Sequence, residues 1–339
     1  MDIELIPIDR IDRWNAGLEK VGGGDIYFHP GYLRPLMERG EGEPFLAHFQ
    51  SGDVHFVHAV MEREIDGARD LCSPYGYAGP IGSVAGNEAA TAFFGAWQKT
   101  ATERGIVSEF IRFHPLIDNA DRFRHLFTVI DHGQTVWIDL TADFTLGYSA
   151  TCRKNLRAAQ NKGVVYETGA SDRRLEEFYA MYSETMQRRQ ALDYYFFQPS
   201  YFRALRDGLG ENFVLASAKY QNKTVAYGLF LRHGPYLHYH LGASDFQLRS
   251  VCGTNLVIHE TAVLGQKNGA RMLHLGGAYG DQVGLFKFKA GFSKNRRTFS
   301  TGRIVYDQRE YDRLTALRRS KNGVPMDENY FPAYRSPLS

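Results

Sequence analysis

Two segments of this chain show the same order of secondary-structure signals, and this order limits its possible folds more than any other feature. In each segment two apolar runs flank a short polar turn, which predicts a β-hairpin, and a glycine-containing connection, a helix and a strand follow. The expected elements lie at 44–49, 54–60, 87–105 and 107–113 in the first half, and at 213–220, 224–231, 236–241, 255–267 and 271–275 in the second. The repeat predicts an α/β (mixed α+β) protein of two tandem units, each with a mixed, mostly antiparallel sheet flanked by helices.

The segment between the two halves contains signals for a domain boundary. An Asp-His-Gly sequence at 131–133 predicts a turn within a strand pair that ends near Leu140. Ser149 or Thr151 then has the residue type of an N-cap for a helix through Asn161. We therefore expect a first unit at 1–145, a second at 146–300, and a C-terminal strand and helix at 301–339 that pack back on the first unit.

Composition excludes several classes of protein. The formal net charge is only +2, so any nucleic-acid contact must come from a local basic patch. The sparse cysteines, without CxxC spacing, favour a reducing cytosol over a disulfide framework or a zinc site; they are Cys72, Cys152 and Cys252. Residues 1–12 lack the apolar region of a signal peptide, and no apolar run approaches the ~20 residues of a membrane span. We therefore expect a cytoplasmic protein without a membrane span; its oligomeric state does not follow from the sequence.

The most distinctive chemistry lies near the end of the second half. The run 273–277 (Leu-His-Leu-Gly-Gly) ends a predicted strand in the pair Gly276 and Gly277, and glycine lets a backbone approach a ligand closely. The run 285–292 then places Lys289 directly after Phe288. A lysine framed by aromatic side chains is a point charge in a partly dry pocket. The alternative is a solvated surface lysine beside core phenylalanines.

These two runs resemble the C-terminal signature of the Fem family, aminoacyl-tRNA-dependent peptidyltransferases built from acetyltransferase-like (GNAT) units. The resemblance covers roughly residues 145–295 and the first half more loosely. It implies that Lys289 lies at the reaction channel, where it binds the donor end and stabilises the oxyanion formed during ester aminolysis, and that Phe288 shapes the channel. Lys287 is the second choice for this role. Because the tRNA ester is already activated, the resemblance implies neither a metal nor a cofactor.

A basic helix face begins the second unit. Arg153 and Arg157 are spaced i, i+4 and share a face, with Lys154 adjacent. This pattern resembles the R-K-x-x-R-x-A motif of the Fem family, which implies phosphate contacts with a tRNA acceptor stem; the alternative is a solvated helix face. Between 294 and 321 basic residues outnumber acidic ones nine to three, and Arg296 and Arg297 in this segment extend the predicted tRNA patch.

Four residues are expected at an acceptor site. Arg188 ends a sequence that resembles the family's T-x-x-R, where the arginine binds an anionic acceptor, and Arg189 is its competitor. Tyr239 lies in an aromatic strand that resembles the border of the family's acceptor site, although it also fits the pattern of a core face. Tyr75 and Tyr77 lie in a segment that resembles the acceptor-side loop of the first domain.

The chain departs from the wall-building Fem enzymes at three positions. Ala78 precedes the Gly-Pro pair where those enzymes commonly carry arginine, Ser83 replaces an acid, and His274 replaces the aspartate before the glycine pair. These departures favour a divergent branch that includes members loading amino acids onto small peptides in natural-product pathways, such as antibiotic biosynthesis, over a peptidoglycan precursor as acceptor. The expected acceptor is a peptide-like small or carrier-bound molecule.

Two other function classes stay open at this point. An acyl-CoA-dependent N-acyltransferase would bind CoA pyrophosphate in an [RQ]-x-x-G-x-[GA] loop; Arg249 begins this pattern, but Cys252 and Thr254 occupy the glycine positions. That degenerate loop favours aminoacyl-tRNA over a CoA thioester as donor. A non-catalytic binding protein with the same fold is the other possibility. Neither Cys152 nor Cys252 lies in a recognisable Cys/His arrangement, which favours bystander thiols.

Overall fold

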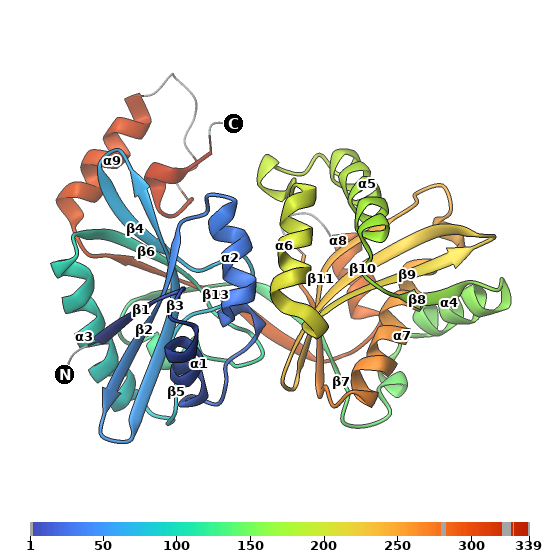
Figure 1. Cartoon of the computed structure of the whole chain (residues 1–339), viewed down its shortest axis with the longest axis horizontal. Helices are drawn as coiled ribbons and strands as arrows, with labels where there is room; N and C mark the ends of the chain where they lie inside the picture. Colours follow the sequence, from blue (N-terminus) through green and yellow to red (C-terminus); the bar gives the residue numbers. More distant parts are fainter. Residues whose placement is uncertain (1–2, 279–282, 321–326, 328, 338–339) are drawn as a thin grey trace. The chain divides into compact units, whose positions relative to one another are not determined.

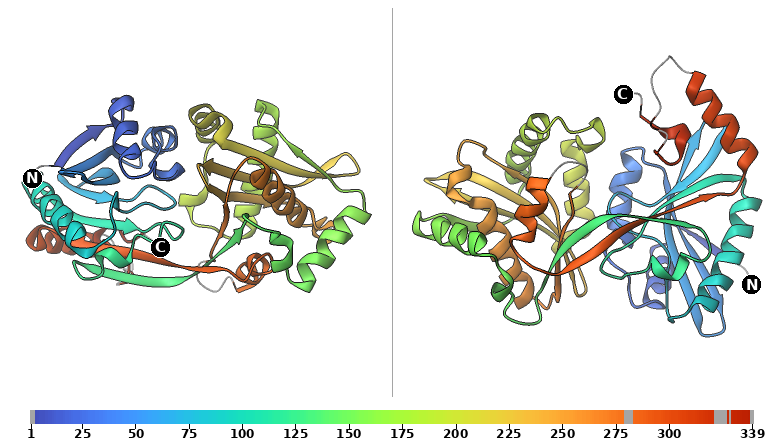
Figure 2. Two further views of the ribbon diagram at one scale, coloured as in Figure 1. Left: turned by 90° about the horizontal axis from the view of Figure 1, so that it is seen from below. Right: turned by 180° about the vertical axis from the view of Figure 1, so that it is seen from behind.

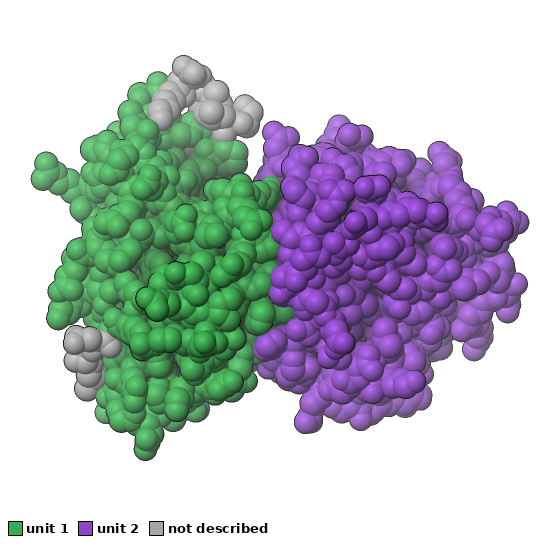
Figure 3. All heavy atoms as spheres, viewed as in Figure 1, with its two compact units in different colours: residues 1–133, 298–339 green, residues 134–297 purple. Residues whose placement is uncertain are grey.

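The computed structural model describes residues 3–278, 283–320, 327 and 329–337 (Figure 1). The chain divides into two compact units: unit 1 comprises Met1–Gly133 and Thr298–Ser339, and unit 2 comprises Gln134–Arg297 (Figure 3). The domain limits predicted from the sequence follow the repeat of secondary-structure elements, whereas these two units are defined by their compactness. The predicted limits therefore stay a prediction. Among the described residues, no helix combines the length and the apolar character needed to cross a membrane.

Unit 1 is built on a mixed sheet with the strand order β1-β2-β3-β4-β6-β13, and β5 pairs with β3. Its strands are β1 (Ile3–Pro7), β2 (Glu43–Ser51), β3 (Val54–Ile65), β4 (Ala68–Cys72), β5 (Ile81–Gly82), β6 (Ile106–Arg112) and β13 (Arg296–Val305). Strands β4 and β6 are parallel, and the other pairs of this sheet are antiparallel.

Helices cover both faces of this sheet because side chains alternate along its strands. On β2, Phe45 and Phe49 belong to the core under α3, whereas the intervening Leu46 packs against Gly17 of α1. In the C-terminal segment, the Arg335 side chain donates a 2.6 Å hydrogen bond to the buried carboxylate of Asp70 on β4. The helices of this unit are α1 (Ile11–Glu19), α2 (Pro30–Glu38), α3 (Asn87–Glu103) and α9 (Gln308–Ser320).

Unit 2 repeats this plan with the strand order β7-β12-β11-β10-β9-β8. Its strands are β7 (Thr128–Asp139), β8 (Val165–Thr168), β9 (Phe213–Tyr220), β10 (Lys223–His233), β11 (Tyr236–Ser244) and β12 (Met272–Gly276). Strands β11 and β12 are parallel and flank α7 in the sequence, as β4 and β6 flank α3 in unit 1. The repeated element order and the mixed, mostly antiparallel sheets are therefore confirmed.

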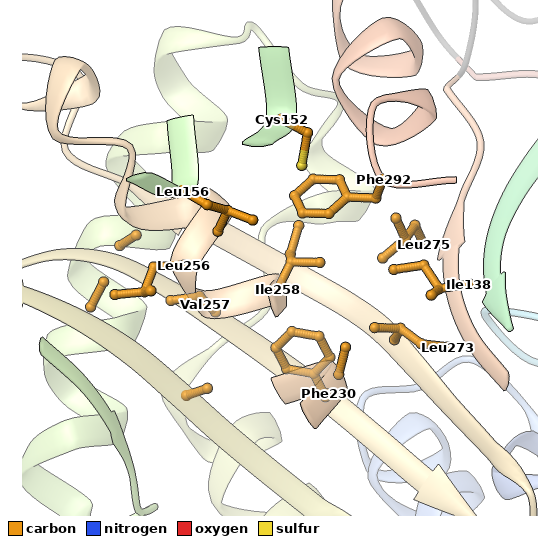
Figure 4. Close-up of a cluster of buried hydrophobic side chains, with 14 of the residues drawn as sticks. Ile138, Cys152, Leu156, Phe230, Leu256, Val257, Ile258, Leu273, Leu275 and Phe292 are labelled. Atoms are coloured by element: carbon orange, nitrogen blue, oxygen red, sulfur yellow. The ribbon is translucent and has the colours of Figure 1, made fainter. Parts of the chain in front are cut away.

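The helices of unit 2 also lie on both faces of its sheet (Figure 2). On β10, Ala226 belongs to the core beneath α4 and α7, and Figure 4 shows this core in close-up. The next residue, Tyr227, lies on the other face, where its ring centre is 5.8 Å from that of Phe178 in α5. The helices are α4 (Ala150–Asn161), α5 (Asp172–Arg188), α6 (Pro199–Leu209), α7 (Gly253–Lys267) and α8 (Val283–Ala290).

The prediction of a turn at 131–133 is wrong. β7 runs through this tripeptide as one continuous strand. Ser300 and Arg124 donate to the Asp131 carboxylate at 2.6 and 2.7 Å, and a hydrogen bond of 2.7 Å joins the His132 ring to Thr301. These tertiary contacts hold polar residues of turn-like composition in extended backbone.

Candidate functional site

The centre of the candidate site is the contact between α8 and the end of β12. The ammonium nitrogen of Lys289 donates a 2.6 Å hydrogen bond to the carbonyl oxygen of Gly277. Gly276 has a φ of 72°, a conformation that favours glycine, and a Cβ atom at Gly277 would lie only 2.9 Å from the carbonyl oxygen of Gln134 on β7. The predicted glycine pair is thus needed for the backbone path that meets Lys289.

A buried aromatic ring anchors the C-terminal end of α8. Phe292 is fully buried in the core of unit 2 (Figure 4). Its ring packs edge-on against the rings of Tyr148 and Phe288, each at 5.5 Å. The backbone amide of Ser149 donates to the carbonyl of Gly291 at 2.8 Å. The segment that carries Lys289 is therefore joined to the start of α4, the predicted basic helix.

The positive charge of Lys289 lies in a partly buried environment. Burial, and secondarily the positive charge of Arg189, lower the pKa of Lys289 to about 8. No carboxylate of the described residues lies within salt-bridge distance of this ammonium group. At neutral pH Lys289 is a cation that no acid of the described residues pairs with, which suits it to bind an anion or to stabilise a developing oxyanion.

The basic face of α4 is exposed as predicted. The Ser149 hydroxyl accepts from the Cys152 amide at 3.1 Å and is the N-cap, so the first of the two expected caps is confirmed. Arg153, Lys154 and Arg157 are exposed, and no described carboxylate pairs with any of them. A helix face with unpaired cations is suited to phosphate groups.

The two predicted arginines after α8 also lie close to this region. The guanidinium group of Arg296 lies over the ring of Phe286 in α8, at 5.5 Å, and that of Arg297 lies over the Trp137 ring on β7, at 5.8 Å. Cation–π contacts hold these charges near the surface without neutralising them. They place positive charge beside the helix that carries Lys289.

The predicted acceptor residues are more dispersed. Arg188 lies over the ring of Phe246 at 4.8 Å, while its neighbour Arg189 is the guanidinium that acts on the charge of Lys289. Tyr239 is half-buried, its ring lies 5.2 Å from that of Phe230, and its hydroxyl fills the space where Gly242 lacks a side chain. Burial raises the pKa of Tyr239 to about 12.

Tyr75 and Tyr77 belong to unit 1. The Tyr32 hydroxyl donates to the Tyr75 carbonyl at 2.5 Å, and the Tyr77 ring lies 5.5 Å from Tyr27 and 5.6 Å from Phe299. Burial raises the pKa of Tyr77 to about 12, so this phenol stays neutral. The Tyr77 ring is thus part of an aromatic cluster in unit 1, and the role of both tyrosines toward an acceptor stays a prediction.

In the connection from β11 to α7, where a CoA-dependent enzyme would bind pyrophosphate, several backbone amides donate within the chain. The Asp245 carboxylate accepts the backbone amides of Gln247 and Leu248, at 2.8 and 3.2 Å. The amide of Cys252 donates at 3.2 Å to a carbonyl of the 3₁₀ turn η6 (Arg249–Val251). Amides that already donate within the chain are not available to a pyrophosphate. The sequence interpretation noticed the missing glycines of this loop but overlooked Asp245.

The cysteines have the surroundings of unreactive thiols. Cys72 and Cys152 are buried, and Cys252 is half-buried. Burial raises the pKa of all three thiols, that of Cys152 to about 11. Because the thiolate is the nucleophilic form, these residues are poorly suited to covalent catalysis.

Comparisons with known proteins concern the fold of the chain. Residues 148–290 match the model of the acetyltransferase (GNAT) domain family. The fold is similar to that of FemX, with a TM-score of 0.71 at 14% sequence identity over 94% of this chain and 99% of FemX. No curated protein sequence matches the chain significantly.

Two further solved structures share the fold. L-PGS from Bacillus licheniformis has a TM-score of 0.57 at 15% identity, over 88% of this chain and 92% of that one. The C-terminal domain (DUF2156) of a putative lysylphosphatidylglycerol synthetase from Agrobacterium fabrum has a TM-score of 0.53 at 14% identity, over 89% and 92%.

The chain is therefore a protein with the fold of a GNAT-type transferase. More particularly, it has the FemX-like tandem GNAT fold, and the resemblance to the Fem family that the sequence motifs indicated is confirmed at the level of the fold.

Proposed function

We propose that this protein transfers an aminoacyl group from aminoacyl-tRNA to an amine of a peptide-like acceptor, forming a peptide bond. The observation that carries this proposal is the partly buried ammonium of Lys289, which donates to the Gly277 carbonyl and pairs with no carboxylate of the described residues. This cation lies in a segment that Ser149 joins to the exposed basic helix α4. The proposed donor supplies phosphates for the helix and an ester carbonyl for the lysine.

The proposed reaction needs no activation beyond the ester bond of the donor. The acceptor amine, in its neutral form, attacks the ester carbonyl carbon and forms a C–N bond, while the carbonyl electron pair moves onto oxygen. Lys289 stabilises this oxyanion, whose collapse breaks the ester C–O bond. The amine proton reaches the departing ribose oxygen through water, so that the products are an amide and a tRNA with a free terminal hydroxyl group.

In this proposal Phe288 shapes the channel. The residues that contact tRNA are Arg153, Lys154, Arg157, Arg296 and Arg297. The candidates for binding the acceptor are Arg188, Arg189 and Tyr239. Ala78, Ser83 and His274 replace residues that are common in the wall-building Fem enzymes. Acceptors from antibiotic biosynthesis therefore fit this chain better than peptidoglycan precursors do. We propose the cytoplasm as its location, where charged tRNA is present.

The competing donor is an acyl-CoA. The missing glycines at Cys252 and Thr254 argue against it, and the amides of Gln247, Leu248 and Cys252 already donate within the chain. A non-catalytic role is disfavoured by the charge of Lys289, since a partly buried cation that no described carboxylate pairs with costs stability.

The proposal is tested by offering the protein both donor classes. Purified protein is incubated with a panel of peptide amines, and with phosphatidylglycerol as a lipid acceptor, together with either a labelled charged-tRNA pool or acetyl-CoA. We expect a labelled amide that forms only with charged tRNA and is abolished by RNase added beforehand. A product that requires acetyl-CoA and survives RNase would overturn the proposal.

A further inference from the structure

An exposed aromatic ring in unit 2 carries two guanidinium groups, that of Arg188, which was considered for the acceptor above, and that of Arg249, which the proposed reaction does not use. Phe246 follows β11, and its side chain is 45% exposed. The guanidinium group of Arg188, at the end of α5, lies 4.8 Å from its ring centre, and that of Arg249, in η6, lies at 4.2 Å. We call these three residues the Phe246 stack.

The positive charges of the Phe246 stack are not neutralised. In the part of the chain that the structure describes, no carboxylate pairs with Arg188 or Arg249. The adjacent acid, Asp245, accepts two backbone amides and pairs with Lys223 at 2.7 Å. The stack thus presents two cations and an aromatic ring to solvent.

The Phe246 stack adjoins both other parts of the candidate site. Helix α4 packs against η6, and Lys162 at its C-terminal end donates to the Ser250 carbonyl at 2.8 Å. Arg188 also precedes Arg189, whose charge, after burial, lowers the pKa of Lys289. The stack therefore adjoins both the helix proposed for phosphates and a cation that acts on the reactive lysine.

We propose that the Phe246 stack binds the unpaired nucleotides at the end of an RNA. This proposal rests on the proposed tRNA-dependent function and specifies where the single-stranded part of the donor binds. Bases stack on aromatic rings and on guanidinium planes without regard to sequence, and the edges of the same guanidinium groups bind phosphates. An acidic protein partner would use the cations but would have no need of the ring. In this proposal Arg188 contacts the donor rather than the acceptor.

The test measures the binding of two labelled hairpin RNAs by fluorescence anisotropy at fixed salt. One hairpin ends in a four-nucleotide 3′ overhang, and the other has the same duplex with a blunt end. We expect the wild-type protein to bind the overhang RNA more tightly, and Phe246→Leu to weaken this binding on the order of tenfold while leaving blunt-end binding unchanged. Phe246→Tyr keeps the ring and should retain the preference for the overhang.

Arg249→Ala should weaken overhang binding and reduce the dependence of the logarithm of affinity on the logarithm of salt by about one. The matched control is Arg173→Ala, because Arg173 is an exposed arginine of the same helix as Arg188 but pairs with Glu177 at 3.1 Å. This control should bind both RNAs as the wild type does.

Equal affinity of Phe246→Leu and the wild type for the overhang RNA would overturn the Phe246 stack as a nucleotide site. It would leave the tRNA-dependent reaction standing if the wild type still transfers a labelled aminoacyl group. A wild-type protein that binds neither RNA and transfers nothing from charged tRNA would overturn both proposals. An overhang preference that Phe246→Leu removes, with the Arg173→Ala control unaffected, supports the site.

Discussion

The ammonium group of Lys289 and the carbonyl group of Gly277, twelve positions apart in the chain, are joined by a 2.6 Å hydrogen bond. This bond fixes a helix that carries the reactive cation to the end of a core strand. On the other side, Phe292 anchors the same helix in the core beneath α4. Fixed cations stabilise a developing oxyanion better than mobile ones because they need not reorganise during the reaction.

The first prediction concerns Gly277. Alanine at this position would place Cβ 2.9 Å from the Gln134 carbonyl oxygen, so the strand end must shift and the Lys289 contact must loosen. We expect Gly277→Ala to lower the free energy of unfolding by about 1–3 kcal/mol, as overpacking does, and to reduce turnover as well. Chemical denaturation and steady-state kinetics measure the two effects.

Gly284→Ala is the matched control for this substitution. Gly284 lies in α8, and nothing is within 4 Å of the position that its Cβ would take. Because alanine is a better helix former than glycine, this variant should be as stable as the wild type or more stable by up to about 1 kcal/mol. If Gly277→Ala were as stable and as active as Gly284→Ala, the close backbone approach at Gly277 would be needed neither for stability nor for turnover.

The second prediction concerns pH. Burial, followed by the charge of Arg189, lowers the pKa of Lys289 to about 8, so the ammonium form is lost as the pH rises through about 8. If amide formation depends on this cation, its rate should fall above that pH. The rates are compared at a constant concentration of neutral acceptor amine. Lys289→Arg should keep its charge over this range and lose the fall, since the guanidinium group stays protonated.

The same pKa shift has a consequence for stability. The unfolded chain holds the lysine proton more tightly than the folded one does, so Lys289 lowers stability below about pH 8, and this cost disappears as the pH rises past the ordinary lysine value. Unfolding measured at several pH values should show a smaller gain between pH 8 and pH 10 for Lys289→Met than for the wild type. An equal gain in both proteins would contradict the burial of the charge.

The third prediction concerns the basic face of α4. Replacing Lys154 and Arg157 by glutamate should weaken tRNA binding and lower the magnitude of its salt dependence, because fewer counter-ions are released from the RNA. Reversal of Arg203, which already pairs with Glu176 at 3.0 Å, serves as the charge control. Titrations at several salt concentrations give the slopes. An unchanged slope in the α4 variant would mean that this face does not contact phosphate.

Much of the fold was predictable because local signals and tertiary structure agree. The hairpin turns at 51–53 and 221–223 lie between apolar runs, and both hairpins form as β2–β3 and β9–β10. The turn expected at 131–133 does not form, since side-chain contacts with Ser300 and Thr301 come from a strand far away in the sequence. Local composition contains no information about such partners.

The site was predictable to a similar degree. Lys289 could be singled out because a family motif contains it, but the roles of its neighbours depend on where α5 ends. Helix α5 ends at Arg188, whose guanidinium group lies over Phe246, while the charge of the next residue, Arg189, acts on Lys289. Asp245 could have been noticed as an acid able to cap the loop after a strand, a common role of aspartate. The exposed stack at Phe246 had no sequence signal, because exposure is a tertiary property.

The central claim, that Lys289 stabilises the transition state of aminoacyl transfer, is tested most directly by single-turnover kinetics with excess enzyme and labelled aminoacyl-tRNA. We predict that Lys289→Ala lowers the rate of amide formation on the order of 10²–10³-fold, the loss expected for one oxyanion donor, with native stability retained. Lys287→Ala, which removes an exposed lysine from the same helix, should react at the wild-type rate. An unchanged rate for Lys289→Ala would contradict the account.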